Sequence, residues 1–586
     1  MESVVDVVKI VEELVKVPRY ALVGRALNYP VYLSTREGVT SLWRIDPKDC
    51  SSKRLTTKPV HGAAPPKPNC PYVVFTVDVA GGKELHRIYY VDIRSGKESL
   101  VSDTPLMRIF SLAIDGERVA FTAATQEDIA IYVARLGGDW EKAQVINTYA
   151  LVTDMYGDLI VGFGKLRSDP RTLELFIYDL STGEFKVYTP KEGANSKRPK
   201  IVKDGRILFE SDFEGRNKLY IYDLSSDELS EIGFTYEDYV KYRAIEHHSY
   251  GETPWGDIWA IGKKCGRGRL FIDGKEIPTP EGMFIGEPVF LGNFVYITMS
   301  SLTKPPKVFR VDLRGGEIDV VIENELPKEI SDRLGEVKFV KYKSFDGLEI
   351  PTYVVKSRLA SKPGPTVIYV HGGPWSEVMD SWNVTIASLV ASGYHVIAPN
   401  FRGSKGYGDW FRNLDVGDPG GGDLMDIVHA RKWGIKEGIA DPNKVVIMGY
   451  SYGGYMTYLA MGKYPDLWCC GVAGAGVVDW VGMYGLGDAV FRKFIDILFA
   501  GKKELMKERS PINYVSNVKK PICIIHPQND TRTPLKPVIK YMKKLLELGK
   551  VFEAHIAPDM GHIILTTDDA LKVLLPAILF LKRYVK

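Results

Sequence analysis

The chain has few cysteines for its length, and none of them is paired at a metal-ligand spacing. Six cysteines in 586 residues are too few for a disulfide framework, and their spacing excludes a zinc-finger type of site. We expect no metal site and no cofactor. Adjacent Cys469 and Cys470 are expected to pack in a core, whereas a bridge between Cys50 and Cys70 stays open at this point.

The chain also lacks a strong charge of one sign and any long uncharged apolar run. Its 76 basic and 73 acidic residues nearly cancel, so we expect no nucleic-acid partner and no membrane-surface partner. The N-terminal segment is apolar at helical spacing, but Asp6, Lys9 and Glu12 interrupt it, which a secretory signal does not tolerate. No stretch reaches the roughly 18 apolar residues of a membrane span. We therefore expect a cytoplasmic protein.

The first part of the chain repeats one pattern seven times. An apolar strand and a turn lead into a second strand, which often ends in Asp before a turn rich in Gly or Ser. The second strands recur every 39 to 50 residues. This period in short strands predicts a seven-bladed β-propeller over residues 20–325, because a four-stranded blade needs neighbours to bury its faces. A stack of unrelated β-sandwiches would not keep this spacing. The residues that mark the second strands are Asp46, Asp92, Arg135, Asp179, Asp223, Asp273 and Asp312.

From about residue 335 the pattern changes to continuous apolar strands that alternate with amphipathic helices. Strands such as PTVIYV and KVVIMGY alternate with segments such as GGDLMDIVHARKWGIKEG. This alternation predicts a mainly parallel sheet with helices on both faces, over residues 326–586. The helix expected over residues 1–19 precedes the first blade, so we expect it to pack outside the propeller, on this second domain.

A G-x-S-x-G motif stands where one of these strands ends and a helix begins. It places Ser451 on a sharp strand-to-helix turn, which is typical of the nucleophile in an α/β-hydrolase domain. By itself the motif also fits a glycine-rich turn. A serine hydroxyl needs a base to take its proton, and Asp530 and His562 follow later strands in the order that this fold uses. We therefore predict a catalytic Ser451–His562–Asp530 triad. His526 and His555 are weaker candidates for the base, because His555 lies inside a strand, where its side chain is expected to point into the core or the sheet.

The segment His371-Gly372-Gly373-Pro374 follows an early strand, in the position of a loop that stabilises an oxyanion. We assign the backbone amides of Gly373 and Tyr452 as the two oxyanion donors. The alternative for this segment is a simple tight turn. His371 is expected to orient the loop rather than to act as a second base.

Taken together, HGGP, FRGSKGYG, GYSYGGYM, the segment DTR and DMGH resemble the prolyl oligopeptidase family of serine peptidases. Among its members the chain is most similar to the acylaminoacyl peptidases of archaeal type. The resemblance extends over the whole chain and is most specific in the last 250 residues. It implies release of an N-acylated amino acid from the blocked N-terminus of short peptides, with esterase activity on small acyl esters.

The resemblance also implies residues that contact the substrate. By the match to the DxR motif, Arg532 is expected to hydrogen-bond a substrate carbonyl on the acyl side of the cleaved bond; alternatively it is a solvated loop residue or an ion-pair partner of Asp530. A stripe at helical spacing is expected to form an apolar side-chain pocket, although such a stripe is also typical of plain core. The pocket residues predicted are Val477, Trp480, Phe491, Phe494, Ile495, Leu498 and Thr533.

The propeller is expected to cover the active site and admit only short N-acylated peptides. No adjacent Glu-Glu pair occurs between residues 20 and 325, which disfavours a dipeptidyl peptidase because that activity needs acidic groups for a free ammonium. An endo-acting oligopeptidase, a carboxylesterase and an interaction module on an inactive hydrolase remain as alternatives. The oligomeric state, a homodimer included, stays open.

Overall fold

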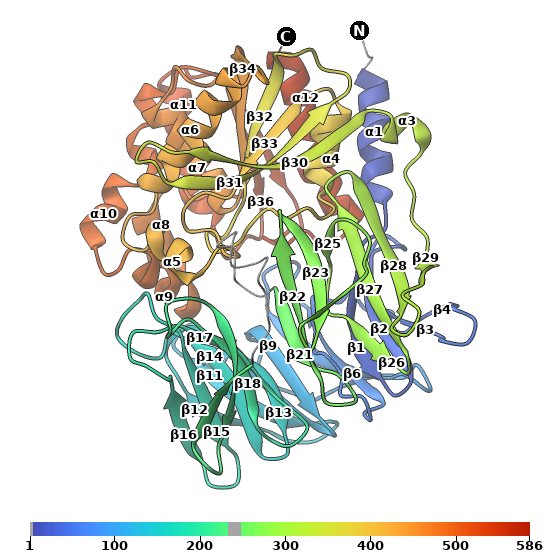
Figure 1. Ribbon diagram of the computed structural model, residues 1–586. Helices are drawn as coiled ribbons and strands as arrows, with labels where there is room; N and C mark the ends of the chain where they lie inside the picture. Colours follow the sequence, from blue (N-terminus) through green and yellow to red (C-terminus); the bar gives the residue numbers. More distant parts are fainter. Residues whose placement is uncertain (1–3, 233–247, 586) are drawn as a thin grey trace.

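The computed structural model describes residues 4–232 and 248–585, and it confirms a seven-bladed β-propeller followed by an α/β-hydrolase domain (Figure 1). Six blades are four-stranded antiparallel sheets, and the seventh has five strands because β25 (Met283–Phe284) and β26 (Val289–Leu291) both pair with β27 (Phe294–Ser301). The marker strands expected from the sequence are the third strands of blades 1 to 6 and β28 of blade 7.

The strands of the first four blades are as follows: β1 (Tyr20–Ala26), β2 (Tyr29–Ser34), β3 (Ser41–Ile45) and β4 (Ser52–Arg54); β5 (Gly62–Ala63), β6 (Tyr72–Asp78), β7 (His86–Asp92) and β8 (Glu98–Leu100); β9 (Arg108–Asp115), β10 (Arg118–Ala124), β11 (Ile129–Arg135) and β12 (Trp140–Val145); β13 (Ala150–Tyr156), β14 (Leu159–Gly164), β15 (Glu174–Asp179) and β16 (Glu184–Tyr188). The strands of the last three blades are β17 (Ser196–Ile201), β18 (Ile207–Ser211), β19 (Lys218–Asp223) and β20 (Glu228–Glu231); β21 (Ser249–Glu252), β22 (Ile258–Lys264), β23 (Arg267–Ile272) and β24 (Lys275–Ile277); β25 (Met283–Phe284), β26 (Val289–Leu291), β27 (Phe294–Ser301), β28 (Lys304–Asp312) and β29 (Ile318–Ile322).

Apolar packing joins the two ends of the propeller ring. Blade 1 contains only strands from the start of the propeller and blade 7 only strands from its end. Their facing side chains form one buried cluster, in which Tyr20, Leu22 and Tyr32 of blade 1 pack with Tyr296 and Val308 of blade 7. The ring is therefore closed by burial of apolar surface between the first and last blades.

The hydrolase domain is built on one eight-stranded sheet in the order β30-β31-β33-β32-β34-β35-β36-β37. The pairs β30–β31 and β31–β33 are antiparallel, and all later pairs are parallel. The strands are β30 (Leu334–Lys343), β31 (Glu349–Ser357), β32 (Gly364–Val370), β33 (His395–Pro399), β34 (Ala440–Tyr450), β35 (Cys470–Gly474), β36 (Ile522–Pro527) and β37 (Phe552–Ala557). The helices are α3 (Lys328–Ser331), α4 (Val384–Ala391), α5 (Asp409–Arg412), α6 (Gly422–Lys436), α7 (Tyr452–Lys463), α8 (Trp480–Leu486), α9 (Ala489–Leu498), α10 (Lys503–Glu508), α11 (Leu535–Glu547) and α12 (Thr567–Tyr584).

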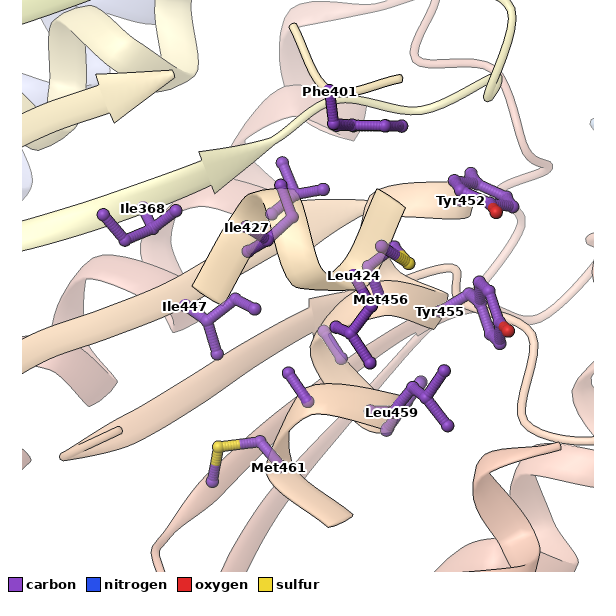
Figure 2. Packing of buried hydrophobic residues seen from close by; sticks show 14 of the residues in the cluster. Ile368, Phe401, Leu424, Ile427, Ile447, Tyr452, Tyr455, Met456, Leu459 and Met461 are labelled. Atoms are coloured by element: carbon purple, nitrogen blue, oxygen red, sulfur yellow. The ribbon is translucent and has the colours of Figure 1, made fainter. Parts of the chain in front are cut away.

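Each face of this sheet carries its own apolar core. On one face, side chains of α6 and α7 pack on the central strands, and Figure 2 shows Leu424, Ile427, Met456 and Leu459 gathered beside Ile447 of β34. On the other face, α4 and α12 cover the sheet. Burial on both faces explains why the strands read as continuous apolar runs, and it fixes the strand ends that carry the active site.

The N-terminal helix α1 (Val4–Lys16) lies against the hydrolase domain, beside α4 and α12 (Figure 1). Val7, Ile10, Val11 and Leu14 fall on one helical face and are buried in the same core as α4 and α12. Residues 1–3, at the start of the segment expected to be helical, lie outside the described residues. The first blade begins only after this helix, at Tyr20.

The structure settles whether Cys50 and Cys70 form a bridge. Cys50 and Cys70 are both free thiols, so the bridge that the sequence left open is not formed. Cys470 is buried, and its sulfur lies 4.0 Å from that of Cys469. Among the described residues, none of the helices combines the length and apolarity that a bilayer crossing requires.

Candidate active site

Ser451 occupies the sharp turn between β34 and α7. Its φ of 58° lies in the left-handed region that is strained for a residue with a Cβ. The flanking glycines allow the turn, because a Cβ at Gly453 would lie 2.0 Å from the carbonyl oxygen of Val370, and one at Gly449 would lie 2.5 Å from that oxygen. The motif therefore holds the Ser451 hydroxyl clear of the sheet edge, beside the N-terminus of α7.

The structure brings Ser451, His562 and Asp530 into one hydrogen-bonded chain. His562 Nε2 lies 2.9 Å from Ser451 Oγ, and His562 Nδ1 lies 2.7 Å from Asp530 Oδ2. The three residues follow β34, β37 and β36, so parallel strands deliver them to one edge of the sheet. This arrangement lets His562 accept the Ser451 proton while Asp530 holds the ring in the required tautomer.

Asp530 is buried and is surrounded by donors. Its Oδ1 accepts hydrogen bonds from the backbone amides of Arg532 and Thr533, at 2.9 and 2.8 Å, and its Oδ2 accepts one from the Thr533 hydroxyl at 2.7 Å. Burial raises the pKa of Asp530, but the charge and hydrogen bond of His562 outweigh it and hold the pKa below its usual value. Asp530 is therefore ionised at neutral pH and serves as the acceptor for His562.

The other histidines of this domain lie away from Ser451 or have structural contacts. His526 is fully buried in β36, where its Nε2 donates to the Thr533 carbonyl at 2.7 Å. His555 was expected to point into the core or the sheet, but its side chain is 40% exposed because β37 is the edge strand of the sheet. His371 is buried, and its Nε2 lies 2.8 Å from Ser404 Oγ, so it orients the loop that precedes Gly373.

The two predicted oxyanion donors flank Ser451. Tyr452 is the first residue of α7, and Gly373 lies in the loop after β32, the strand next to β34. A Cβ at Gly372 would lie 3.2 Å from Cβ of Ser451, so this loop passes directly over the nucleophile. Burial of the Tyr452 side chain, whose hydroxyl donates to Asp423 at 2.5 Å, fixes the backbone that carries the first amide. The geometry suits an anion that develops beside Ser451.

Ser451, His562 and the oxyanion residues open into a cavity of about 520 Å³ between the two domains. From the hydrolase domain, its apolar wall includes Val477, Trp480, Phe491 and Phe494 as predicted, and Thr533 also lines it. Ile495 and Leu498 do not. Both are completely buried in the core beneath α9, and Val490 and Ile497 line the cavity from that helix instead. The helix is apolar on more than one face, so spacing alone did not identify which side meets the cavity.

Arg532 lines the same cavity but is held by the propeller. Its Nε donates to Glu84 Oε2 at 2.8 Å and its Nη2 to Oε1 at 2.5 Å, in a bidentate ion pair. Asp530 receives the Arg532 backbone amide rather than its guanidinium. Sequence reasoning missed Glu84, because it lies 448 residues away and in a propeller turn without a local motif.

Arg108, at the start of β9, is a second residue that the sequence did not reveal. Its Nε donates to Asp488 at 2.7 Å, its Nη2 donates to Thr531 Oγ1 at 2.8 Å, and its Nη1 donates to Glu84. Asp488 is the N-cap of α9, the helix that walls the cavity. Arg108 therefore ties the propeller to the apolar wall and to the Asp530 loop at once.

The propeller turn 81–84 rests on both loops that carry the triad partners of Ser451. Asn529 Nδ2 donates to the Gly81 carbonyl at 2.8 Å, and a Cβ at Gly82 would lie 2.3 Å from the Gly561 nitrogen. This close approach requires glycine on both sides. Within residues 4–232 and 248–585, no group of three or more His, Cys, Asp or Glu side chains is arranged to hold a metal ion.

Two family descriptions match the chain in succession. Residues 31–309 match "Acylamino-acid-releasing enzyme-like, N-terminal domain", and residues 380–586 match "Prolyl oligopeptidase family". The first match falls within the propeller, and the second contains Ser451, Asp530 and His562.

The names of individual relatives describe different activities. The chain is 25% identical to dipeptidyl aminopeptidase BIII of Pseudoxanthomonas mexicana, over 89% of this chain and 73% of that protein. It is 30% identical to the acylamino-acid-releasing enzyme of Arabidopsis thaliana over 35% of this chain, and so spans only 28% of that relative's length. A solved structure from a study of two prolyl endopeptidases superposes with a TM-score of 0.85 at 16% identity, covering 100% of this chain and 92% of that one. At that identity the likeness shows the fold alone.

Proposed function

Because the chain belongs to the prolyl oligopeptidase family of serine peptidases, we propose that it releases N-acylated amino acids from the blocked N-termini of short peptides. Small acyl esters are a second substrate class, since they need less protonation of the leaving group. We place the protein in the cytoplasm, as its sequence indicates. The match of residues 31–309 to the N-terminal domain of acylamino-acid-releasing enzymes supports this specificity.

The pairing of Glu84 with two arginines is the observation that best supports the proposal. A dipeptidyl or aminopeptidase site needs an available carboxylate for the free ammonium of its substrate, but Glu84 is already bound by Arg532 and Arg108. No other Asp or Glu among the described residues lines the cavity or its neighbouring pocket on the propeller side. An acylated amino terminus carries no charge, so it needs no such partner.

The reaction follows from the positions of the side chains. His562 takes the Ser451 proton as Oγ attacks the carbonyl of the N-acylated residue, and the amides of Gly373 and Tyr452 receive the oxyanion. His562 then passes that proton to the leaving amine, which departs as the shortened peptide. Water, deprotonated by His562, hydrolyses the acyl-enzyme and restores Ser451. Arg532 directs Nη1 to the acyl part of the substrate while Glu84 holds its other nitrogens.

A substrate panel tests the proposal. Acetyl-phenylalanine p-nitroanilide, a peptide with the same residue inside an amino-blocked longer chain, an unblocked dipeptide anilide and p-nitrophenyl acetate separate the four classes of activity. We expect the acetylated amino acid to be released from the first, with the unblocked dipeptide anilide hydrolysed much more slowly. Cleavage of only the internal bond indicates an endo-acting oligopeptidase, and turnover of the ester alone indicates a carboxylesterase.

The nucleophile is tested separately. Ser451→Ala is expected to abolish labelling by a fluorophosphonate probe and to lower kcat on the acetylated anilide by about six orders of magnitude. Equal labelling of the wild type and the variant contradicts the assignment, and absence of labelling in both identifies an inactive hydrolase.

A further inference from the structure

The charged side chains that line the catalytic cavity are basic. Among the described residues, no Asp or Glu lines the cavity, although the chain as a whole is nearly neutral. Six basic residues line it, five of them apart from Arg532. These residues are Lys165, Lys197, Arg198, Lys405, Arg412 and Arg532.

Part of this charge lies across Ser451 from the acyl-binding arginine. In the sheet, β36 and β37 lie on one side of β34 and carry Asp530, Arg532 and His562, whereas β32 and β33 lie on the other. Lys405 and α5, which contains Arg412, follow β33. The Lys405 backbone amide donates to the carbonyl of Ser376, in the loop just after Gly373, at 3.0 Å. The basic groups therefore border the oxyanion loop on the side away from Arg532.

Two buried carboxylates offset part of this positive charge, and one of them, Glu210, accepts from Arg198. Asp409 accepts from Lys197 and Arg412, both at 3.1 Å, and from Asn217 at 2.9 Å. Lys405 is exposed to the cavity, and its Nζ has no hydrogen bond or ion pair with the described residues. Among the described residues, Lys165 and Lys405 thus line the cavity without a carboxylate partner.

Burial of the Lys165 ammonium in the cavity wall costs desolvation free energy. Its side chain is nine-tenths buried, and its Nζ donates to the Pro170 carbonyl at 2.6 Å, which uses one of its three donor hydrogens. Burial, followed by the nearby charge of Arg412, lowers the pKa of Lys165 to about 7. A bound anion would offset both effects and keep the ammonium charged.

We propose that Lys165, Lys405 and Arg412 form a subsite that binds a carboxylate of the substrate, and that this carboxylate is the free C-terminus of a short peptide. The inference rests on the proposed function. An N-acylated peptide has lost its amino-terminal charge, so its C-terminal carboxylate is the one charge that every such peptide keeps. A cavity of about 520 Å³ has room for only a few residues, which brings that carboxylate close to the lysines.

The test compares peptides that differ only in the terminal group. Acetyl-phenylalanyl-diglycine is assayed as the free acid and as the C-terminal amide, and amides ending in glutamate or glutamine instead of the last glycine report on a side-chain carboxylate. We expect kcat/KM to be at least about tenfold higher for the acid than for its amide, the size expected for a charge-assisted hydrogen bond. A preference for the glutamate amide alone assigns the subsite to acidic side chains.

Variants at an accessible position link the preference to the cavity. Lys405→Gln removes a charge from an exposed side chain and is expected to reduce the acid-to-amide ratio about tenfold, while Lys405→Arg retains it. Lys191→Gln, at an exposed lysine of the propeller that does not line the cavity, is the matched control and leaves the ratio unchanged. Lys165→Gln is expected to act in the same direction as Lys405→Gln.

Two results overturn the inference. One is equal kcat/KM for the acid and the amide in the wild type, and the other is an acid-to-amide ratio that Lys405→Gln leaves unchanged or that Lys191→Gln reduces equally. Acetyl-phenylalanine p-nitroanilide has no carboxylate, so its hydrolysis reports on the proposed function alone. Loss of the carboxylate preference with that hydrolysis intact therefore separates the two failures.

Discussion

At the level of single residues, Asp530 decides which nitrogen of His562 faces Ser451. Its Oδ2 accepts from His562 Nδ1, which leaves Nε2 free to take the serine proton. Asp530→Asn is expected to lower kcat on acetyl-phenylalanine p-nitroanilide by about 10⁴-fold, because an amide stabilises the wrong tautomer and no longer balances the imidazolium. Asp559→Asn, at an exposed carboxylate in the loop before His562, is the control, and a comparable loss there would contradict the assignment.

Phe494 and Ile495 are neighbours on α9, but Phe494 lines the cavity and Ile495 lies in the core. Phe494→Ala is expected to raise KM for the phenylalanine substrate relative to an alanine substrate, because Phe494 lines the cavity. Ile495→Ala is expected to lower the free energy of unfolding by about 2–5 kcal/mol, because Ile495 is fully buried, while the substrate preference stays unchanged. Kinetics on both substrates and urea denaturation of both variants check this. A change of preference in Ile495→Ala alone contradicts the placement.

Residues that act through a local motif could be predicted from the sequence, and residues that act through a distant contact could not. Ser451, Asp530 and His562 each follow a recognisable strand, so their order identified them. Glu84 and Arg108 occur in ordinary propeller hairpins, and their partners in the hydrolase domain are more than 370 residues away. Only the docking of the domains gives these two residues a role.

At the scale of elements, regular repetition made the blades predictable, whereas departures from it were hidden. The second strand of each hairpin kept its spacing, which gave the number of blades. In blade 7, β25 and β26 are two short pieces that pair with the same strand, and the sequence pattern contains no signal for this break. Helix periodicity indicated an apolar face on α1, but it did not indicate that the side chains of this face are buried in the core of the hydrolase domain.

The buried face of α1 predicts that this helix stabilises the hydrolase domain. Leu14 is completely buried against the core that α4 and α12 share, whereas Val5 on the same helix is 60% exposed. Leu14→Ala is expected to cost about 2–5 kcal/mol of unfolding free energy, and Val5→Ala no more than about 0.5 kcal/mol. Urea denaturation followed by tryptophan fluorescence measures both. Equal effects would mean that α1 does not contribute through its packed face.

At the scale of the whole molecule, Glu84 joins the propeller to the hydrolase domain. Burial raises the pKa of Glu84, but the hydrogen bonds and charge of Arg532, with the charge of Arg108, lower it to about 2. The unfolded carboxyl has a pKa of about 4.3. Because the folded pKa is the lower one, the stabilisation by Glu84 is complete above pH 4.3 and is lost as the pH falls towards 2.

Glu84→Gln tests this coupling between the domains. At pH 7 the variant is expected to lose about 3–5 kcal/mol of stability, because the buried guanidinium of Arg108 and the partly buried guanidinium of Arg532 lose their shared counter-ion. Between pH 4.5 and 2.5 the melting temperature of the wild type should fall more steeply than that of the variant, which has no carboxyl to protonate there. Burial lowers the pKa of His61, whose Nε2 lies 3.8 Å from Glu84, and the Glu84 charge raises it, so the variant also shifts the titration of this histidine.

The matched control for Glu84 is Glu37, which forms a partly exposed ion pair with Arg54. Glu37→Gln is expected to change stability by no more than about 1 kcal/mol, because solvent screens an exposed pair. Scanning calorimetry of the three proteins across the pH range measures these differences. If Glu84→Gln kept the wild-type slope below pH 4.5, the acid loss would come from other carboxylates, and the turn 81–84 would hold the two domains together through its backbone contacts alone.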